Sequence, residues 1–513
     1  MIQGYNFFQQ VLTKNPILNP LIWLKEALYF IATEKRYFWY ICLAAIITAI
    51  TSYTNFGHNT GDEYSQIFEF AGYKMGYIDQ GDLRIEFGSH MRPTIQVWMV
   101  VAVFRFIGLF TSQVNPFLVT YLVYLTSGLF GIFSILVFTK AFMARVKPQF
   151  REWFVVISLF SWLVLYTNPH FNSESICGHL LLLAVGMLFA KLENLSVGRI
   201  IVSGLLLGLS FSCRFQIGFA ILGLMLWLLC PAYKAKKLSQ WWLLASSMVI
   251  AILMFNFTSD FYFYGKWVCS AYNYYHQNIA LGIMDSWSGV SPWYAYLFMV
   301  SMYLPFGPLY VLTTLYYFIK YPLDVLTSII GFFLLFHVLI GHKEVRFLMP
   351  MLGFLPLILM VVTADLVERF DWLSLHLKKI ATIIWIMNLI ACMSLLIPAA
   401  TEIGGWRYLY NHYRKPTLVY FNVSVNQKLL FYKKKNVNLV KYKSGEPTPC
   451  PPGYNVLIAM NANSNDAKPN CPLVYTFFPF NLSNILPKAI VHAVGHFDLY
   501  EVKNIESDKG SAD

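Results

Sequence analysis

The chain has 513 residues, of which 57% are hydrophobic and only 12% are charged. A typical soluble domain is about 25% charged, so this composition excludes an ordinary soluble protein and predicts a polytopic membrane protein. The net charge of +12 is spread over loops and one tail, which argues against nucleic acid and favours membrane lipids and a phosphate-bearing substrate as partners.

Apolar stretches that can cross a membrane recur along the chain, at about 20 residues for each crossing. Residues 1–36 lack the short apolar core of a cleavable signal peptide, so we expect a cytoplasmic N-terminal segment there. The stretches predict an all-α transmembrane domain over residues 37–398 with about eleven crossings. These crossings are 37–54, 116–140, 153–168, 175–191, 199–213, 216–230, 241–258, 303–319, 323–341, 346–363 and 380–398.

Basic loops predict the orientation of these crossings. Clusters that begin at Lys140, Lys234 and Glu368 should be cytoplasmic, because Lys and Arg are enriched in cytoplasmic loops. This pattern holds only if a further apolar stretch, residues 94–112, does not cross, so we interpret it as a juxtamembrane or re-entrant helix. The N-terminus is then cytoplasmic, and both the loop 55–115 and the C-terminus are extracytoplasmic.

Ionisable and amide side chains collect in the loops that this topology places on the outer side. Charge at the edge of a bilayer is costly and usually marks a substrate or ion path. The candidates are His58, Asp62 and Glu63 in HNTGDEY, Arg214 in CRFQ, Lys266 in YGKW, Asn273, and His342, Lys343, Glu344 and Arg346 in HKEVRFLMP.

Simpler interpretations of several of these residues stay open. Asp62 and Glu63 can belong to a solvated turn, and Arg214 at a helix end can extend towards lipid headgroups. Lys343 and Arg346 beside Glu344 can form an interfacial ion pair. The glycines within 203–208 indicate helix packing through small residues rather than a phosphate loop.

The residue types favour transfer of a sugar from a lipid-phosphate donor. A carboxylate near the interface can deprotonate a sugar hydroxyl as general base. Basic groups can hold a phosphate and stabilise the charge that develops as it leaves. A lipid-linked-glycan transporter or flippase without transferase activity is the alternative, and a purely structural membrane subunit is a weaker one.

The motifs GDEY (61–64), YGKW (264–267) and HKEVRFLMP (342–350) resemble those of the Alg9-like family, the polyprenyl- or dolichyl-phosphate-mannose-dependent mannosyltransferases of GPI-anchor and lipid-linked-oligosaccharide assembly. Their order and spacing resemble the GPI third-mannose branch best. The resemblance implies a GT-C type membrane glycosyltransferase fold and a catalytic base in the first outer loop. It also implies a polyprenyl-phosphate sugar donor and a lipid-linked glycan acceptor.

Carried onto this sequence, the resemblance makes Asp62 the base, with Glu63 beside it to orient the acceptor. We expect an inverting reaction without metal or cofactor. Phosphate binding falls to Arg214, His342, Lys343 and Arg346, and acceptor orientation to His58, Glu344, Asn273 and Lys266. The chain departs from the family pattern at Gly61, where relatives usually have Pro, and at 168–175, where an Arg is missing and Asn172 and Glu174 are candidates to replace it.

Residues 399–513 form a polar, basic tail. Its short apolar runs Thr417–Phe421, Tyr454–Met460 and Leu473–Phe478 predict strands of a small extracytoplasmic α/β or β-rich domain. Cys450 and Cys471 could form a disulfide in an oxidising compartment. Because the C-terminal sequence SDKGSAD carries no retention signal, we expect a bacterial inner membrane rather than the endoplasmic reticulum.

Overall fold

The structure, a computed structural model, describes residues 35–190, 192, 195–400, 402–422, 429–442, 448–461, 471–476 and 497–502. The chain forms two compact units. The helical unit comprises Met1–Thr54, Arg84–Met99 and Leu122–Leu396, and the mixed unit comprises Asn55–Leu83, Val100–Tyr121 and Ile397–Asp513. The predicted first outer loop, residues 55–115, therefore contributes to both units.

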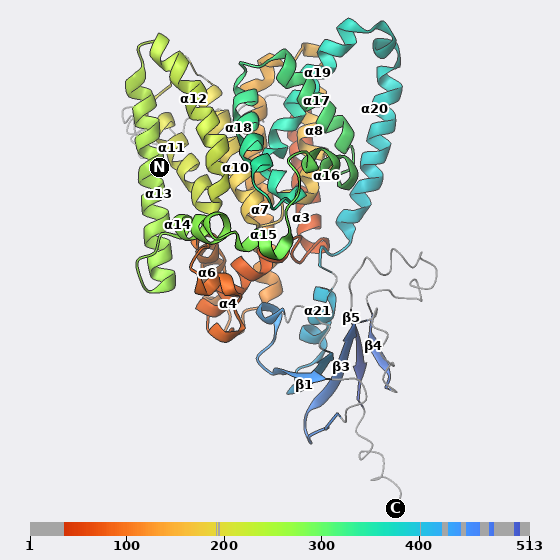
Figure 1. The fold of residues 1–513 in the computed structure, drawn as a ribbon. Helices are drawn as coiled ribbons and strands as arrows, with labels where there is room; N and C mark the ends of the chain where they lie inside the picture. Colours follow the sequence, from red (N-terminus) through yellow and green to blue (C-terminus); the bar gives the residue numbers. More distant parts are fainter. Residues whose placement is uncertain are drawn as a thin grey trace, which may run out of the picture. The chain divides into compact units, whose positions relative to one another are not determined.

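Long apolar helices build the helical unit (Figure 1). Within the described ranges, seven helical segments are long and apolar enough to cross a membrane. They are α3 (Lys35–Thr54), α7 (Pro116–Phe142), α8 with α9 (Arg151–Phe160, Trp162–Thr167), α12 (Gly218–Lys234), α13 (Leu238–Tyr264), η8 with α19 (Val345–Phe354, Leu355–Arg369) and α20 (Asp371–Cys392).

Further helices complete the unit. The pair α17 (Gly307–Lys320) and α18 (Val325–Leu339) is bent by 119° at its junction and would be an eighth span if counted as one. Shorter apolar helices are α10 (Ser173–Phe189), α11 (Val197–Cys213) and α6 (Ile95–Gly108), of which α6 is divided between the two units after Met99. The connection from α13 to α17 contains α14 (Ser270–Tyr275), α15 (Ile283–Ser288) and α16 (Ala295–Tyr303).

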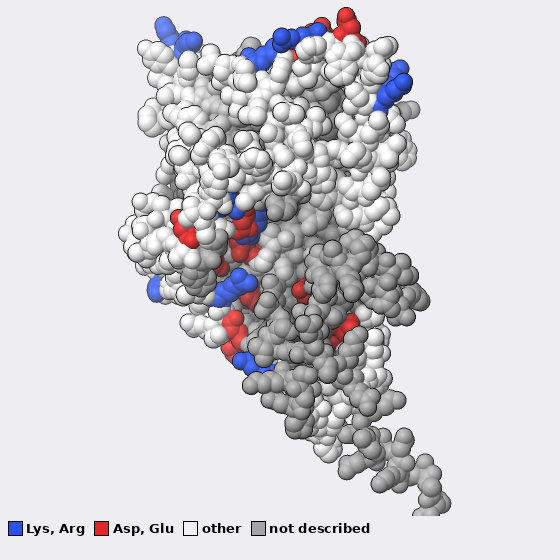
Figure 2. All heavy atoms as spheres, turned by 45° about the vertical axis from the view of Figure 1, so that its right-hand side comes forward, with Lys and Arg blue, Asp and Glu red and all other residues white. Residues whose placement is uncertain are grey.

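The prediction of a mostly helical, multi-span membrane protein is confirmed. Each of the eleven predicted stretches overlaps one of these helices or two consecutive ones, and residues 94–112 contain α6. The surface of the helical unit in Figure 2 is a broad band almost free of charged residues, as contact with hydrocarbon requires, with Lys, Arg, Asp and Glu along its upper edge. The number of crossings stays a prediction.

Ion pairs gather the predicted cytoplasmic loops at one end of the helical unit. Arg36, near the start of α3, lies 3.2 Å from Glu152 at the start of α8. Lys147, in the loop before α8, pairs with Glu368 at the end of α19. Arg145 of the same loop pairs with Asp324 between α17 and α18. The loops that follow α7, α17 and α19 therefore meet, as the eleven-crossing topology expects of three loops on one side.

Glycines allow close packing of α11 against α13, as the sequence indicated. A Cβ atom on Gly204 would lie 2.6 Å from the carbonyl oxygen of Leu244, and one on Gly208 would lie 2.5 Å from that of Met248. Only glycine lets the two backbones approach this closely. The interpretation of residues 203–208 as a packing surface is confirmed.

The mixed unit contains a five-stranded sheet with the order β2-β1-β3-β5-β4. Its strands are β1 (Thr417–Asn422), β2 (Val437–Tyr442), β3 (Asn455–Asn461), β4 (Leu473–Tyr475) and β5 (Phe497–Glu501). β1 pairs in parallel with β2 and β3, and β5 pairs antiparallel with β3 and β4. The three predicted strands are β1, β3 and β4, although the end of the last run lies outside the described residues.

One face of this sheet packs around Tyr420, Ile458 and Tyr500. Cys450 and Cys471 pack against this cluster and are free thiols in the structure, so their pairing stays a prediction. The same unit contains α21 (Glu402–His412) and, from the first outer loop, the π-helix η1 (Glu63–Phe68) followed by α4 (Glu69–Lys74). The predicted α/β or β-rich tail is thus a mixed sheet with helices.

Candidate active site

Helix α10 presents an acidic residue at its first turn. Asn172 caps the helix, because its Oδ1 accepts the amide N–H of Ser175 at 2.7 Å. The cap fixes where the helix begins and so places Ser173 and Glu174 at the end of the unit opposite its basic loops. The Glu174 side chain is 1% exposed. A carboxylate at a helix N-terminus is stabilised by the helix dipole, which offsets part of the cost of burial.

Arg214 ends α11 and turns inwards to this carboxylate. Its backbone is extended, which stops the helix, and its side chain is buried. Nη1 lies 2.9 Å from Oε1 of Glu174 and donates to Oγ of Ser173 at 3.1 Å. The interpretation of Arg214 as a residue that extends to lipid headgroups is wrong, because its guanidinium is enclosed by protein.

The HKEVRF motif supplies a second arginine to the same place. The motif joins α18 to η8, and η8 packs closely on α10, since a Cβ on Gly178 would lie 2.9 Å from Cα of Pro350. Arg346 binds Glu344 with both arms of its guanidinium, Nε to Oε2 at 2.6 Å and Nη2 to Oε1 at 2.9 Å. Its Nε also lies 4.0 Å from Glu174.

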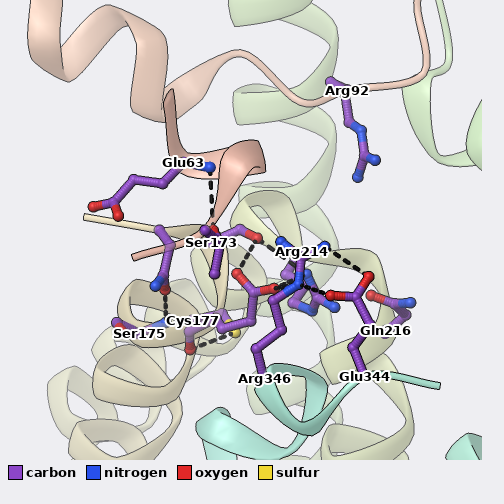
Figure 3. Close-up of polar contacts among 12 residues, drawn as sticks. Glu63, Arg92, Ser173, Ser175, Cys177, Arg214, Gln216, Glu344 and Arg346 are labelled. Carbon is purple, nitrogen blue, oxygen red and sulfur yellow. Dashed lines mark hydrogen bonds and ion pairs between the residues drawn. The ribbon is translucent and has the colours of Figure 1, made fainter. Parts of the chain in front are cut away.

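Figure 3 shows Ser173, Arg214, Glu344 and Arg346 close together. With Glu174, which pairs with Arg214, and His342, whose Nε2 lies 2.9 Å from Glu344, they form a charged cluster. The ring of Phe347 lies 5.0 Å from the guanidinium carbon of Arg214 and 5.4 Å from that of Arg346. The ring of Phe347 therefore lies near both arginines of the cluster. Of the predicted phosphate-binding residues, it contains Arg214, His342 and Arg346.

Lys343 points to a different set of partners. Its ammonium donates to the carbonyl oxygens of Ser291, at 3.1 Å, and Ile340. The side chain is 5% exposed, and burial lowers the pKa of Lys343 although the nearby charge of Asp285 opposes this. In the structure, Lys343 anchors the loop to the segment before α16, and its role towards phosphate stays a prediction.

The part of the first outer loop that belongs to the helical unit is fixed by a buried carboxylate. Asp260 of α13 is fully buried and accepts both the amide and the hydroxyl of Thr94, at 3.0 and 2.7 Å, and the hydroxyl of Ser270. The predicted orienting residue Asn273 donates to the carbonyl of His90 at 3.2 Å. Burial lowers the pKa of His90, and the neighbouring charge of Lys266 lowers it further.

This segment also carries Arg92, which the sequence analysis did not single out. Arg92 pairs with Glu86 at 2.5 Å, and its guanidinium carbon lies 5.4 Å from the ring centre of Tyr274. The hydroxyl of Tyr274 accepts the side-chain amide of Gln216 at 2.9 Å, and Gln216 follows Arg214 by two residues. Arg92, Tyr274 and Gln216 thus form a chain of contacts that begins two residues after Arg214. No local motif marked it, because its members come from three separate loops.

Asp62, Glu63 and His58 belong to the mixed unit. Glu63 is 1% exposed, and its Oε2 accepts the amide N–H of Asn59 at 3.0 Å. Asp62 stands at the start of η1 and is only half-buried. The ring of His58 lies 5.4 Å from that of Tyr64. Glu63 therefore fixes the turn that carries Asp62, and Asp62 is the more accessible carboxylate of the two.

The chain is similar in fold to a solved structure. This is the crystal structure of ArnT from Cupriavidus metallidurans bound to undecaprenyl phosphate, with a TM-score of 0.50 and 12% sequence identity. The similarity covers 82% of this chain and 92% of that chain. It shows a shared fold.

Two curated relatives are similar in sequence over shorter stretches. GPI mannosyltransferase 3 of Candida albicans is 31% identical over 116 residues, and GPI mannosyltransferase 3 of Debaryomyces hansenii is 30% identical over 165 residues. The matches cover 22% and 31% of this chain, and 22% and 28% of the relatives, so the chain spans about a quarter of the length of the relatives it matches.

A family model matches far more of the sequence. The model of the Alg9-like mannosyltransferase family matches residues 37–406, which include the charged cluster as well as Asp62 and Glu63. The resemblance inferred from the three motifs is thereby confirmed, and the chain belongs to the Alg9-like mannosyltransferase family.

Proposed function

We propose that the chain transfers a mannosyl residue from a polyprenyl-phosphate donor to a lipid-linked glycan acceptor at the outer or luminal face of a membrane. Membership of a mannosyltransferase family supports the class of reaction. The observation that carries the proposal to particular residues is the charged cluster, in which Arg214 and Arg346 both approach the buried carboxylate of Glu174.

Arg346 is the residue to which the donor phosphate would bind first. A guanidinium fork that holds a carboxylate with two parallel hydrogen bonds has the geometry to hold two phosphate oxygens. Glu344, which fills this fork in the structure, is 34% exposed, whereas Glu174 is 1% exposed. A phosphate would therefore displace Glu344 and leave Glu174 in place to orient Arg214.

The displacement also releases His342 from Glu344, so that its ring can donate to the phosphate. Arg214, His342, Lys343 and Arg346 would then stabilise the negative charge that grows on the leaving phosphate. These cationic groups do the neutralising that a divalent metal does in other transferases, so the mechanism needs no metal.

Asp62 is the proposed base. Its carboxylate accepts the proton of the acceptor hydroxyl while the hydroxyl oxygen forms a bond to the anomeric carbon of the sugar. The bond from that carbon to the phosphate oxygen breaks, and its electron pair leaves with the polyprenyl phosphate. A single displacement of this kind inverts the configuration, so a β-linked donor gives an α-linked product.

The remaining predicted residues orient the acceptor in this proposal. Glu63 holds the turn that carries Asp62, and Asn273 holds the backbone at His90. His58, Lys266 and the displaced Glu344 are the polar groups that would contact the acceptor glycan. A location in a bacterial inner membrane is retained as part of the proposal.

The test is transfer from radiolabelled polyprenyl-phosphate-mannose into lipid-extractable product, with membranes that contain the wild-type chain or Asp62→Asn. Loss of a general base costs about 10²- to 10⁴-fold in rate. Asp79→Asn is the matched control, because Asp79 lies in the same loop and is exposed. Asp62→Asn should lose product at an unchanged protein level, while Asp79→Asn keeps it.

Full activity of Asp62→Asn would refute the assignment of the base, and Glu63→Gln would be tested next. Absence of product from the wild type with every polyprenyl-phosphate sugar would refute transferase activity and direct attention to transport of lipid-linked glycans.

A further inference from the structure

A large basic pocket lies within the mixed unit. Its volume is about 910 Å³, and its lining includes four cationic residues, Arg414, Lys433, Lys434 and Lys435. Its described lining contains no Asp or Glu. An excess of positive charge in a concave site favours an anionic ligand.

Aromatic rings form part of the wall of this basic pocket. Lys435 lies with its Nζ 5.3 Å from the ring centre of Tyr77, whose ring contacts that of Phe104 edge to face at 5.4 Å. Lys434 lies 4.9 Å from the ring centre of Tyr410. The rings and the lysines together make a surface that is both cationic and apolar.

The lysines of the pocket differ in what holds them. The Nζ of Lys434 donates to the carbonyl oxygens of Tyr410 and Tyr413, at 3.2 and 3.3 Å, so this residue ties the strand connection to the end of α21. Arg414 and Lys435 are exposed. Lys433 and Lys435 are therefore the residues to change if ligand binding is to be separated from folding.

Exposed apolar side chains lie between two lining residues of the pocket in the chain. Phe104 of α6 lines the pocket, and the same helix and the turn after it carry Phe106, Leu109 and Phe110, which are 61%, 78% and 76% exposed. The chain then returns to the pocket wall at Ser112. Three large apolar side chains at this exposure are suited to contact with an acyl or prenyl chain.

From the cationic cavity and the exposed apolar side chains that lie between two of its lining residues in the chain, we propose that the basic pocket binds the phosphate-bearing headgroup of a lipid, with the lipid chain against Phe106, Leu109 and Phe110. A phosphate pairs well with Lys and Arg, and the cavity is large enough for a substituted headgroup. The lipid is either an anionic membrane phospholipid or the lipid-linked glycan acceptor. The site stands without the transferase activity proposed above.

The first experiment measures binding of dioctanoyl phosphatidic acid and dioctanoyl phosphatidylcholine to the purified full chain in a neutral detergent. The variant is Lys433→Gln with Lys435→Gln, and the matched control is Lys441→Gln, an exposed lysine on β2 of the same unit that does not line the pocket. We expect the variant to bind phosphatidic acid about tenfold more weakly, which is ~1.4 kcal/mol. The control should bind it as the wild type does.

A second variant, Phe106→Ser with Phe110→Ser, distinguishes binding of the lipid headgroup from binding of the lipid chain. This variant should bind phosphatidic acid more weakly and bind inorganic pyrophosphate as the wild type does. The lysine variant should bind both more weakly. Equal binding of phosphatidic acid by wild type and lysine variant, at equal unfolding temperatures, would overturn the proposal. So would equal affinities of the wild type for the two lipids.

Transfer kinetics then identify the source of the lipid. If the pocket holds the acceptor, the lysine variant raises the KM for the acceptor and leaves kcat and the donor KM unchanged. If it holds a membrane phospholipid, the variant loses phosphatidic acid binding with no change in the acceptor KM. Because binding is measured directly, failure of the transferase assay does not affect the first result.

Discussion

The two ends of the helical unit carry the same kinds of charged residue in opposite surroundings. At one end, Arg36 and Glu152 form a pair whose side chains are 62% and 47% exposed. At the other end, Arg214 and Glu174 form a pair whose side chains are 7% and 1% exposed. The first pair stays in contact with solvent or headgroups, whereas the second is enclosed by α10, α11 and η8.

This difference matches the distinction that we propose between charges that orient the protein in the membrane and charges that form the donor site. An exposed ion pair contributes about 0–1 kcal/mol and is easily replaced. For a buried pair, the free-energy cost of removing both charges from water often exceeds the attraction between them. A buried pair is therefore not explained by a contribution to stability alone. The enclosed guanidinium groups are the ones to which the proposed function assigns the donor phosphate.

The largest expected effect is on stability, from removal of one partner of each pair. Glu174→Ala leaves the charge of Arg214 buried without its carboxylate, which should cost about 3–5 kcal/mol. Glu152→Ala at the other end should cost less than about 1 kcal/mol. Thermal unfolding of the purified variants in one detergent measures both, and equal losses would remove the distinction between the two ends.

The next largest expected effect is on the KM for the donor, and it depends on the planar shape of the Arg346 guanidinium. Arg346→Lys keeps the positive charge but loses the fork that binds Glu344, and Lys cannot hold two oxygens of a phosphate in the same way. A rise of about tenfold in the KM for the donor is expected, equivalent to ~1.4 kcal/mol. Arg36→Lys is the matched change at the exposed end.

Steady-state transfer with varied donor concentration measures this second effect. Arg36→Lys should leave both kcat and KM as in the wild type. A donor KM that is unchanged in Arg346→Lys would remove Arg346 from the phosphate site, even if the variant were less stable.

The helices and much of the charged cluster could be predicted from the sequence because both depend on local patterns. Apolar runs of membrane-crossing length became helices, and the HKEVRF motif keeps its own ion pair of Glu344 and Arg346. The partnership of Arg214 with Glu174 could not be predicted. It joins residues 40 positions apart in the chain, and only the packing of α10 against α11 and η8 brings them together.

The same reason explains what was missed in the outer loops. Residues 55–115 are a single loop in the predicted topology, yet they are divided between the two units. Thr94 is held by the side chain of Asp260 in α13, whereas the turn at Glu63 is held by a hydrogen bond from the backbone N–H of Asn59 to the side chain of Glu63. In the tail, apolar runs predicted strands, but the order β2-β1-β3-β5-β4 depends on non-local pairing that no local pattern specifies.

The smallest expected effect concerns Lys343, whose ammonium is buried among backbone carbonyls. Because burial lowers the pKa of Lys343, the unfolded chain binds this proton at pH values where the folded chain has released it. The free energy of unfolding should therefore rise with pH between the lowered pKa and the ordinary value of about 10.5. In Lys343→Met this contribution to the rise is lost.

The measurement is the difference in unfolding free energy between wild type and Lys343→Met at neutral pH and at about pH 10, near the ordinary lysine value. The difference should shift in favour of the wild type at the higher pH, by less than about 1.4 kcal/mol for each unit of pKa. Lys378→Met, which removes an exposed ammonium in the first half of α20, corrects for the change in net charge. A difference that moves in the opposite direction would mean that the charge of Asp285, rather than burial, has the larger effect on the pKa of Lys343.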